Sequence, residues 1–201
     1  MNLARPRLLV GSLVAAVVVI GGYAWVQANA DDGSDDAAYD AVLADPQAVV
    51  TYPSDGLTNG AVEGETFPEA SLLDRDGNEI TSADLLGEPM VVNFWYSSCA
   101  PCAKELPDFA AVDAEVDDVR FVGVNTRDSV EEMERFAGER GVEYELLRDH
   151  HADLVDGIQA VAFPITLFVT SDGTIIEQTG PIDADELRAK VAELRAAELL
   201  S

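Results

Sequence analysis

The stretch from Val91 to Pro107 reads VVNFWYSSCAPCAKELP and contains both cysteines of the chain, Cys99 and Cys102. It begins inside a nearly continuous apolar run, residues 89–95, which is typical of a parallel strand that is buried on both faces. Apolar residues then recur at the three- and four-residue intervals of a helix, at Leu106, Phe109, Val112 and Val116. The sequence therefore predicts a buried strand, a short turn with the cysteines, and a helix that starts at them.

The position of the cysteines at a helix start predicts a redox-active pair. A sulfur attacks another sulfur as the thiolate, which a helix N-terminus stabilises through its unpaired N–H groups and its positive dipole end. We expect Cys99 to be the exposed attacking thiol, and Cys102 to lie deeper and act as the resolving thiol. Pro101 suits an early helical position, where its missing N–H costs nothing. The alternative is an inert disulfide, although a bridge across so short a loop would stabilise the fold little.

The chain beyond residue 62 alternates between strand and helix patterns. Further strands are predicted at residues 120–124, 144–147, 165–170 and 174–178. One further helix is predicted from Ser129, whose capping box includes Glu132, to Gly141, and two others are predicted at residues 152–158 and after Asp183. Two Asp-Gly pairs, at residues 76–77 and 172–173, indicate hairpins. This order predicts an α/β fold with a mixed central sheet and helices on both faces.

The N-terminus has the pattern of a membrane anchor. Residues 8–26 contain no charged side chain, and Arg5 and Arg7 precede them. A run of this length, at about 1.5 Å per helical residue, reaches across the roughly 30 Å of a bilayer core. Basic residues in front place the N-terminus in the cytoplasm and the rest of the chain outside.

We therefore expect three segments in the chain. Residues 1–30 form the N-terminal transmembrane helix, residues 31–61 an acidic linker rich in Asp, Ala, Gly and Pro, and residues 62–201 the folded domain. The protein is then a single-pass protein of the cell membrane, with its domain on the extracytoplasmic side. The alternative is a signal peptide cleaved after Ala30, at an Ala-Asn-Ala site, which would release a secreted domain.

The composition excludes several classes of protein. Lys and Arg number 12 against 38 Asp and Glu, for a net charge of −26. So acidic a surface repels phosphate backbones and anionic lipid headgroups, so we expect no nucleic-acid partner. Its simplest role is to keep the protein soluble. Two cysteines can build neither a disulfide-stapled scaffold nor a four-thiolate zinc site.

The stretch around the cysteines resembles the active site of thioredoxin-fold proteins. It is most similar to the exported, membrane-anchored thiol–disulfide oxidoreductases of the TlpA/ResA type. The similarity covers residues 62–199 and continues through residues 85–87 (LLG), 123–125 (GVN), 163–166 (FPIT) and 172–173 (DG). The resemblance implies a thioredoxin-like fold and an enzyme that exchanges disulfides. We expect no cofactor and no bound metal.

The resemblance also assigns roles outside the cysteine motif. Pro164 corresponds to the family's cis-proline, packed opposite the cysteines, where it exposes the backbone of Phe163 for pairing with a client strand. The alternative is a trans proline that begins a strand. The implied partners are client proteins with disulfides, such as apocytochrome c, and a membrane thiol carrier that returns electrons to the protein.

The chain departs from the family pattern in one place and from thioredoxins proper in another. Ser98 stands where the family usually has Trp before the attacking cysteine, which leaves the client-docking surface undefined. Asn93 stands where thioredoxins have a buried acid, as it does in TlpA-like proteins. Proton transfer then falls to water or to Glu105, whose alternative role is that of an exposed helix acid. The catalytic residues are thus Cys99, Cys102 and Pro164, and the supporting residues are Trp95, Pro101, Glu105 and Phe163.

The pattern leaves the direction of exchange open. The leading hypothesis is a disulfide reductase, because Ala-Pro between the cysteines is closer to thioredoxin's reducing dipeptide than to that of strong oxidants. The same site could work as a disulfide oxidase. A third hypothesis is a copper chaperone on the same fold that uses both cysteines with His150 or His151, although a His-His pair has no recurring ligand spacing. A peroxidase is disfavoured, because residues 96–98 lack the Pro/Thr arrangement that precedes a peroxidatic cysteine.

Overall fold

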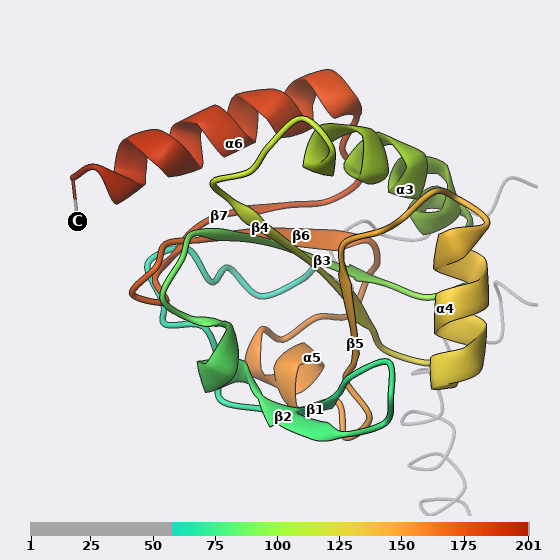
Figure 1. Ribbon diagram of the computed structural model, residues 1–201. Helices are drawn as coiled ribbons and strands as arrows, with labels where there is room; N and C mark the ends of the chain where they lie inside the picture. The colour runs from blue at the N-terminus through green and yellow to red at the C-terminus, as the bar shows by residue number, and fades with distance from the viewer. Residues whose placement is uncertain (1–57, 201) are drawn as a thin grey trace, which may run out of the picture. The chain divides into compact units, whose positions relative to one another are not determined.

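A computed structural model describes residues 58–200 of the chain (Figure 1). The predicted anchor at residues 1–30, the cleavage site after Ala30 and most of the predicted linker lie outside these residues. None of the helices between residues 58 and 200 has the length and apolar character that a bilayer crossing requires.

Seven strands within the described residues form one sheet in the order β2-β1-β5-β4-β3-β6-β7 (Figure 1). The strands are β1 (Ser71–Leu73), β2 (Glu79–Thr81), β3 (Met90–Trp95), β4 (Arg120–Asn125), β5 (Glu145–Arg148), β6 (Ile165–Val169) and β7 (Ile175–Thr179). The pairs β3/β4 and β4/β5 are parallel, whereas β3/β6, β6/β7, β1/β2 and β1/β5 are antiparallel. The prediction of a mixed sheet is therefore confirmed.

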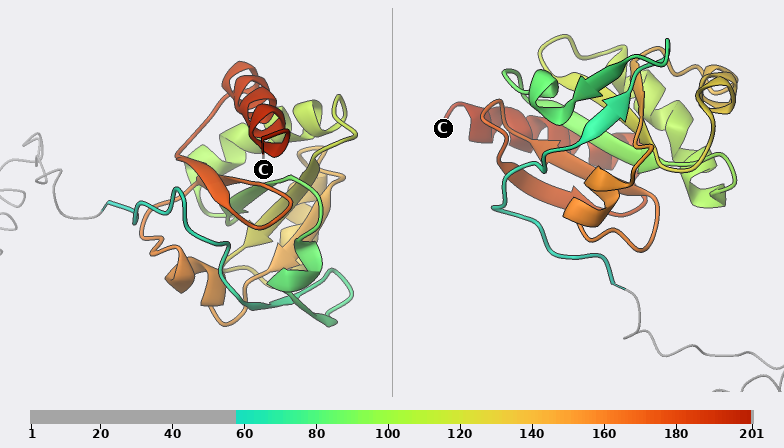
Figure 2. Two further views of the ribbon diagram at one scale, coloured as in Figure 1. Left: turned by 90° about the vertical axis from the view of Figure 1, so that its left-hand side faces the viewer. Right: turned by 90° about the horizontal axis from the view of Figure 1, so that it is seen from below.

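Helices cover both faces of this sheet (Figure 2). They are η1 (Ser82–Leu85), α3 (Ala100–Asp113), α4 (Val130–Gly138), α5 (Asp153–Gly157) and α6 (Ala184–Glu198). One buried cluster joins the sheet to α3, α4 and α6, through side chains such as Phe109, Phe136 and Leu187. A second cluster on the opposite face includes Leu85 of η1 and Leu154 of α5. The sheet is thus buried on both sides, which explains the continuous apolar pattern of its central strands.

The central strand β3 positions the cysteines. All six of its residues are buried, and it lies between β4 and β6. Burying each of its large apolar side chains stabilises the fold by about 1.5–3 kcal/mol. Because β3 ends at Trp95, the chain leaves the sheet at the carboxyl edge of β3 and β4 and enters α3 a few residues later. This edge is where open α/β sheets bind their ligands.

The helix predicted after Ser129 ends earlier than expected. Ser129 is the N-cap, with its hydroxyl accepting the Glu132 N–H, but α4 stops at Gly138 rather than near Gly141. Val142 N–H bonds to Ala137 O, and Gly141 takes a φ of 78°, a conformation that glycine adopts without strain. Gly141 therefore belongs to the turn after the helix.

Candidate active site

Cys99 and Cys102 form a disulfide at the start of α3, with their Cα atoms 5.3 Å apart. Cys99 is the N-cap residue, with extended backbone, and the helix proper begins at Ala100. Its Sγ accepts the backbone N–H of Cys102 at 3.3 Å. In the reduced protein the same N–H and the helix dipole would favour a thiolate on Cys99, because both stabilise negative charge at this point.

Cys99 is much less exposed than the sequence predicted, but it is still more exposed than Cys102, as expected. Cys99 is only 5% exposed, whereas Cys102 is 0% exposed. Tyr96 and Phe163 pack against the buried cluster that contains Cys99. Because only Cys99 retains any exposure, a client sulfur reaches Cys99 first.

The Phe163–Pro164 peptide bond is cis, as the resemblance implies. Pro164 is buried, and it precedes Ile165, which pairs with Phe94 of β3. The Tyr96 and Phe163 rings meet edge to face with their centroids 5.6 Å apart, so the proline loop and the cysteine loop are neighbours. Within residues 58–200 the peptide N–H and C=O of Phe163 have no hydrogen-bond partner. These groups are free to pair with another chain.

Asn59 holds the proline loop from a segment that the sequence assigned to the linker. Its Oδ1 accepts the N–H groups of Val161 and Ala162, both at 2.8 Å, and its Nδ2 donates to Ala162 O at 3.1 Å. The next residue also contacts the domain, because Gly60 N–H bonds to Gln159 O. No sequence pattern could have identified Asn59, because its partners are about a hundred positions away.

Glu105 is buried next to Asn93 and is not an exposed helix acid. It is 4% exposed, its Oε1 accepts Asn93 Nδ2 at 2.8 Å, and its Oε2 accepts Ile182 N–H at 3.3 Å. Asn93 Nδ2 also donates to Thr166 Oγ1 at 3.1 Å. Burial raises the pKa of Glu105 to about 7, with a smaller contribution from the charge of Asp108 and against the effect of the two hydrogen bonds. The carboxyl group can thus gain and lose a proton near neutral pH.

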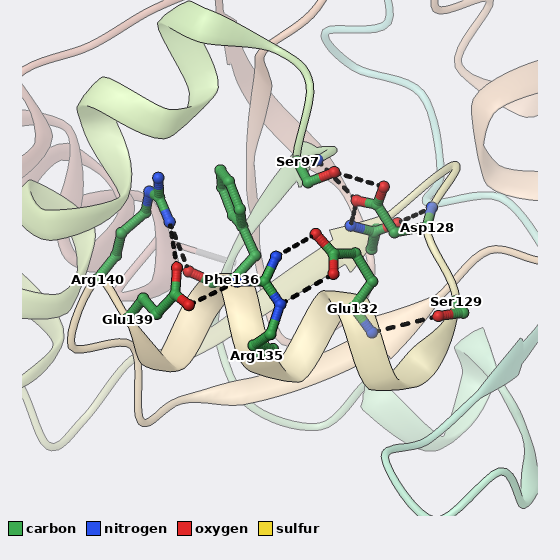
Figure 3. Close-up of polar contacts among 9 residues, drawn as sticks. Ser97, Asp128, Ser129, Glu132, Arg135, Phe136, Glu139 and Arg140 are labelled. Atoms are coloured by element: carbon green, nitrogen blue, oxygen red, sulfur yellow. Dashed lines mark hydrogen bonds and ion pairs between the residues drawn. The ribbon is translucent and has the colours of Figure 1, made fainter.

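Asp128 organises the turn that leads into Cys99 (Figure 3). Its carboxylate accepts Ser97 N–H at 2.6 Å, the Ser97 hydroxyl at 2.7 Å and Asn125 Nδ2 at 2.7 Å. Arg148 Nε donates to Asp128 O at 2.6 Å. The sequence pattern did not identify this role. Ser97 is within three residues of the N-cap cysteine, so this network fixes the approach of the chain to the disulfide.

Trp95 supports the site from within the core. It is fully buried and stacks on Phe136 of α4, with ring centroids 5.8 Å apart. Gly123 leaves room for it, because a Cβ there would lie 3.1 Å from Trp95 Nε1. The indole therefore fixes α4 and the end of β3, and it does not form part of the client-facing surface.

The remaining residues that the sequence analysis named lie on or next to α3 and in the loop between β5 and α5. Pro101 is exposed in the first turn of α3, and Pro107 lies inside the same helix. Ser98 is exposed directly before Cys99. The rings of His150 and His151 lie between β5 and α5, with centroids 3.8 Å apart.

A cysteine pair at the N-terminus of a helix, facing a cis-proline loop on a mixed sheet, defines a thioredoxin-fold dithiol protein. The AhpC/TSA family model matches residues 64–178, which is more than half of the chain. The chain belongs to this family, and within it to the thiol–disulfide oxidoreductases of the TlpA/ResA type.

Individual relatives agree with this assignment. The thiol:disulfide interchange protein HelX of Rhodobacter capsulatus is 30% identical over 96% of this chain and 98% of its own. The thiol-disulfide oxidoreductase ResA of Bacillus subtilis is 28% identical over 57% of this chain, and the match spans 65% of the length of ResA. The solved structure of MTB dsbF is 30% identical with a TM-score of 0.57, covering 62% of this chain and 93% of that one.

Proposed function

We propose that the protein is an extracytoplasmic disulfide reductase that acts through Cys99 and Cys102. The observation that carries the proposal is the Cys102 N–H directed at Cys99 Sγ at the start of α3. This arrangement stabilises the thiolate at the one sulfur that retains some exposure. The relatives named as thiol–disulfide oxidoreductases support the same chemistry.

Reduction of a client takes two exchange steps. The Cys99 thiolate attacks one sulfur of the client disulfide, a bond forms between them, and the other client sulfur leaves as a thiolate and takes up a proton. Cys102 then loses its proton and attacks Cys99 Sγ. The mixed disulfide breaks, the second client thiol is released, and the Cys99–Cys102 bridge closes. Two electrons pass from the protein to the client.

Glu105 is the proton acceptor that we assign to Cys102. It lies three positions after Cys102, on the same face of α3 and one turn further into the domain. A pKa of about 7 leaves roughly half of the carboxyl groups ionised at neutral pH, ready to accept the thiol proton. The amide of Asn93 suits both states, since its nitrogen donates to a carboxylate and its oxygen, which has no partner, would accept from a carboxylic acid after rotation.

A pocket between α3 and the start of α6 connects this acid to solvent. Its volume is about 300 Å³, and its lining residues are Pro101, Lys104, Glu105, Asp108, Pro181, Ile182, Asp183 and Glu186. Through it the proton taken from Cys102 can leave for the bulk.

The client is held at the proline loop. The unpaired N–H and C=O groups of Phe163 can pair with a client strand in β fashion, which places the client backbone beside Cys99. Apocytochrome c and other exported proteins with disulfides are the clients we propose. A membrane thiol carrier is the donor that reduces the Cys99–Cys102 bridge again.

We also propose that residues 1–30 anchor the protein, with residues 31–61 as a linker whose last residues, from Asn59, are bound to the domain, and residues 62–201 as the extracytoplasmic domain. The uncharged run at residues 8–26 supports this arrangement, and the alignment with HelX spans 96% of the chain. A relative from Mycobacterium tuberculosis named soluble secreted antigen MPT53 matches 77% of the chain at 28% identity, which supports export.

Fractionation of cells tests the anchor. The full chain is expected in the membrane fraction, and a chain that starts at residue 58 and carries a cleavable export signal is expected in the soluble one. The reason is that the charged domain has no other apolar run of that length. Recovery of the full chain's product as a soluble protein that begins at Asp31 would establish cleavage after Ala30 instead.

Direct reaction with a client tests the activity. The reduced protein is expected to convert disulfide-bonded apocytochrome c to its dithiol form in a one-to-one reaction, as measured by alkylation of the new client thiols and mass spectrometry. The Cys99→Ser variant is the matched control and is expected to leave the client oxidised. If the oxidised protein instead converts the dithiol client to a disulfide and the reverse reaction is negligible, the protein is an oxidase.

A further inference from the structure

Arg127 lies over the aromatic ring next to the attacking cysteine. Its guanidinium carbon is 4.2 Å from the centroid of the Tyr96 ring. The same ring meets Phe163 at its edge, and Tyr96 O accepts the Cys99 N–H at 3.1 Å. Arg127, Tyr96 and Phe163 therefore form a continuous ridge beside Cys99, on the surface where Ser98 replaces the usual tryptophan.

This cation is unusual in so acidic a protein. Within residues 58–200 most arginines and lysines pair with a carboxylate, and the exceptions are Lys104, Arg127 and Arg148. Arg148 donates instead to Asp128 O. The side chain of Arg127 is exposed and makes no hydrogen bond within the described residues.

The neighbouring carboxylate does not neutralise Arg127. Asp128 directs its oxygens to Ser97 and Asn125, on the inner side of the turn. Because the Arg127 side chain makes no hydrogen bond within residues 58–200, its N–H donors are available as the fork that binds a carboxylate through two hydrogen bonds. Stacking on Tyr96 also restricts the side chain beforehand, so less entropy is lost when a ligand binds.

We propose that Arg127, held on Tyr96, selects clients that carry an acidic side chain close to the reacting cysteine. This inference rests on the proposed disulfide exchange and adds a specificity-determining residue to it. A client strand paired with Phe163 runs along the ridge, which brings side chains near its cysteine within reach of Arg127. The preference opposes the net charge of −26, which by itself would repel acidic clients.

Matched peptides test the proposal with the full chain in detergent. Three short peptides differ only in the residue beside a single cysteine, which is Glu, Gln or Lys. Each carries a neutral 2-pyridyl disulfide, so that attack by Cys99 releases 2-thiopyridone and leaves the peptide on Cys99 until Cys102 displaces it. The second-order rate constant is read from the absorbance of the released thione.

The reduced wild-type protein is expected to react about fivefold faster with the Glu peptide than with the Lys peptide, as is typical of a charge at the rim of an interface. In Arg127→Met the ratio should fall to one or below, and in Arg127→Glu it should favour Lys. The rate with the Gln peptide should stay within about twofold in both variants. Added salt should reduce the wild-type preference, because the pair is exposed.

Two control variants test whether the preference depends on a cation at Arg127 or on the net charge of the protein. Lys104→Met removes the other exposed cation that pairs with no carboxylate within the described residues. Arg195→Met removes a cation that pairs with Asp118, which lies in the loop between α3 and β4. Both should keep the wild-type preference. Equal rates for the Glu and Lys peptides in the wild type, or a preference that survives in Arg127→Met, would overturn the inference while leaving the exchange activity intact. A wild-type protein that reacts with none of the three peptides would overturn the proposed function, and this inference with it.

Discussion

Replacing Cys102 with serine is expected to convert the protein into a trap for its clients. Cys99 would still attack a client disulfide, but no second thiol would resolve the mixed disulfide, so the covalent complex would accumulate. Replacing Cys99 is expected to abolish both attack and trapping, because Cys102 is fully buried and cannot reach a client. Non-reducing gels with mass spectrometry of the trapped species measure both outcomes.

The asymmetry between the two sulfurs can be measured without a client. In the reduced protein Cys99 should react with iodoacetamide at pH 7 much faster than Cys102, because only Cys99 combines some exposure with the N–H of a helix N-terminus. The double variant with serine at both positions serves as the blank. Equal alkylation rates for the two thiols, or trapping by Cys99→Ser, would contradict the assigned order of attack.

Glu105→Gln is expected to slow the resolving step about a hundredfold at pH 7, the lower range for loss of a general base. The amide keeps the size of the side chain but cannot accept the proton of Cys102. In the wild type, the rate of resolution should rise through a pKa of about 7 as Glu105 ionises, and this inflection should be absent from the variant. Stopped-flow mixing of the reduced protein with a disulfide peptide, followed by Trp95 fluorescence, resolves the two steps.

The same substitution should change how stability depends on pH. The pKa of Glu105 is raised from 4.5 to about 7 in the folded protein, so the folded state holds the proton more tightly. The stability that this group contributes is complete below pH 4.5 and is lost as the pH rises through about 7, by about 3 kcal/mol. The free energy of unfolding of Glu105→Gln, relative to the wild type, should increase over that range.

Glu186→Gln is the matched control for both measurements, since Glu186 lines the same pocket but is exposed. It should leave the rate inflection and the pH dependence of stability unchanged. An inflection near pH 7 that persists in Glu105→Gln would show that another group titrates there, and it would contradict the role assigned to Glu105.

The sequence predicted the order of the elements well because the sheet is buried on both faces. The apolar run of β3 and the helical spacing of Leu106, Phe109 and Val112 are local signals that packing reinforces. The position of the cysteine pair at the start of α3 could likewise be predicted from the neighbouring residues. The cis bond before Pro164 came only from the resemblance, since nothing local distinguishes it from a trans proline.

The features that the sequence did not reveal are contacts between distant segments. Asn59 bonds to Val161 and Ala162 across the whole domain, and Asp128 bonds to Ser97 across α3 and β4. Glu105 is buried because it packs against β3 and the loop before α6. The spacing of residues within α3 carries no information about these two segments. In each case a polar side chain finds a partner that only the tertiary fold provides.

The reduction potential of the Cys99–Cys102 pair tests the central claim most directly. Ala100 and Pro101 carry no charge, so the Cys102 N–H and the helix terminus are what stabilise the Cys99 thiolate. Even in a partly buried geometry a helix terminus contributes at most about 2 kcal/mol, and at about 1.4 kcal/mol per 30 mV this shifts the potential by no more than about 40 mV. We therefore predict, for the full chain equilibrated with glutathione or dithiothreitol buffers, a potential at or below about −230 mV, between the values of glutaredoxins and thioredoxin. A value near about −120 mV, that of a strong oxidant, would contradict the reductase and identify the protein as a disulfide donor.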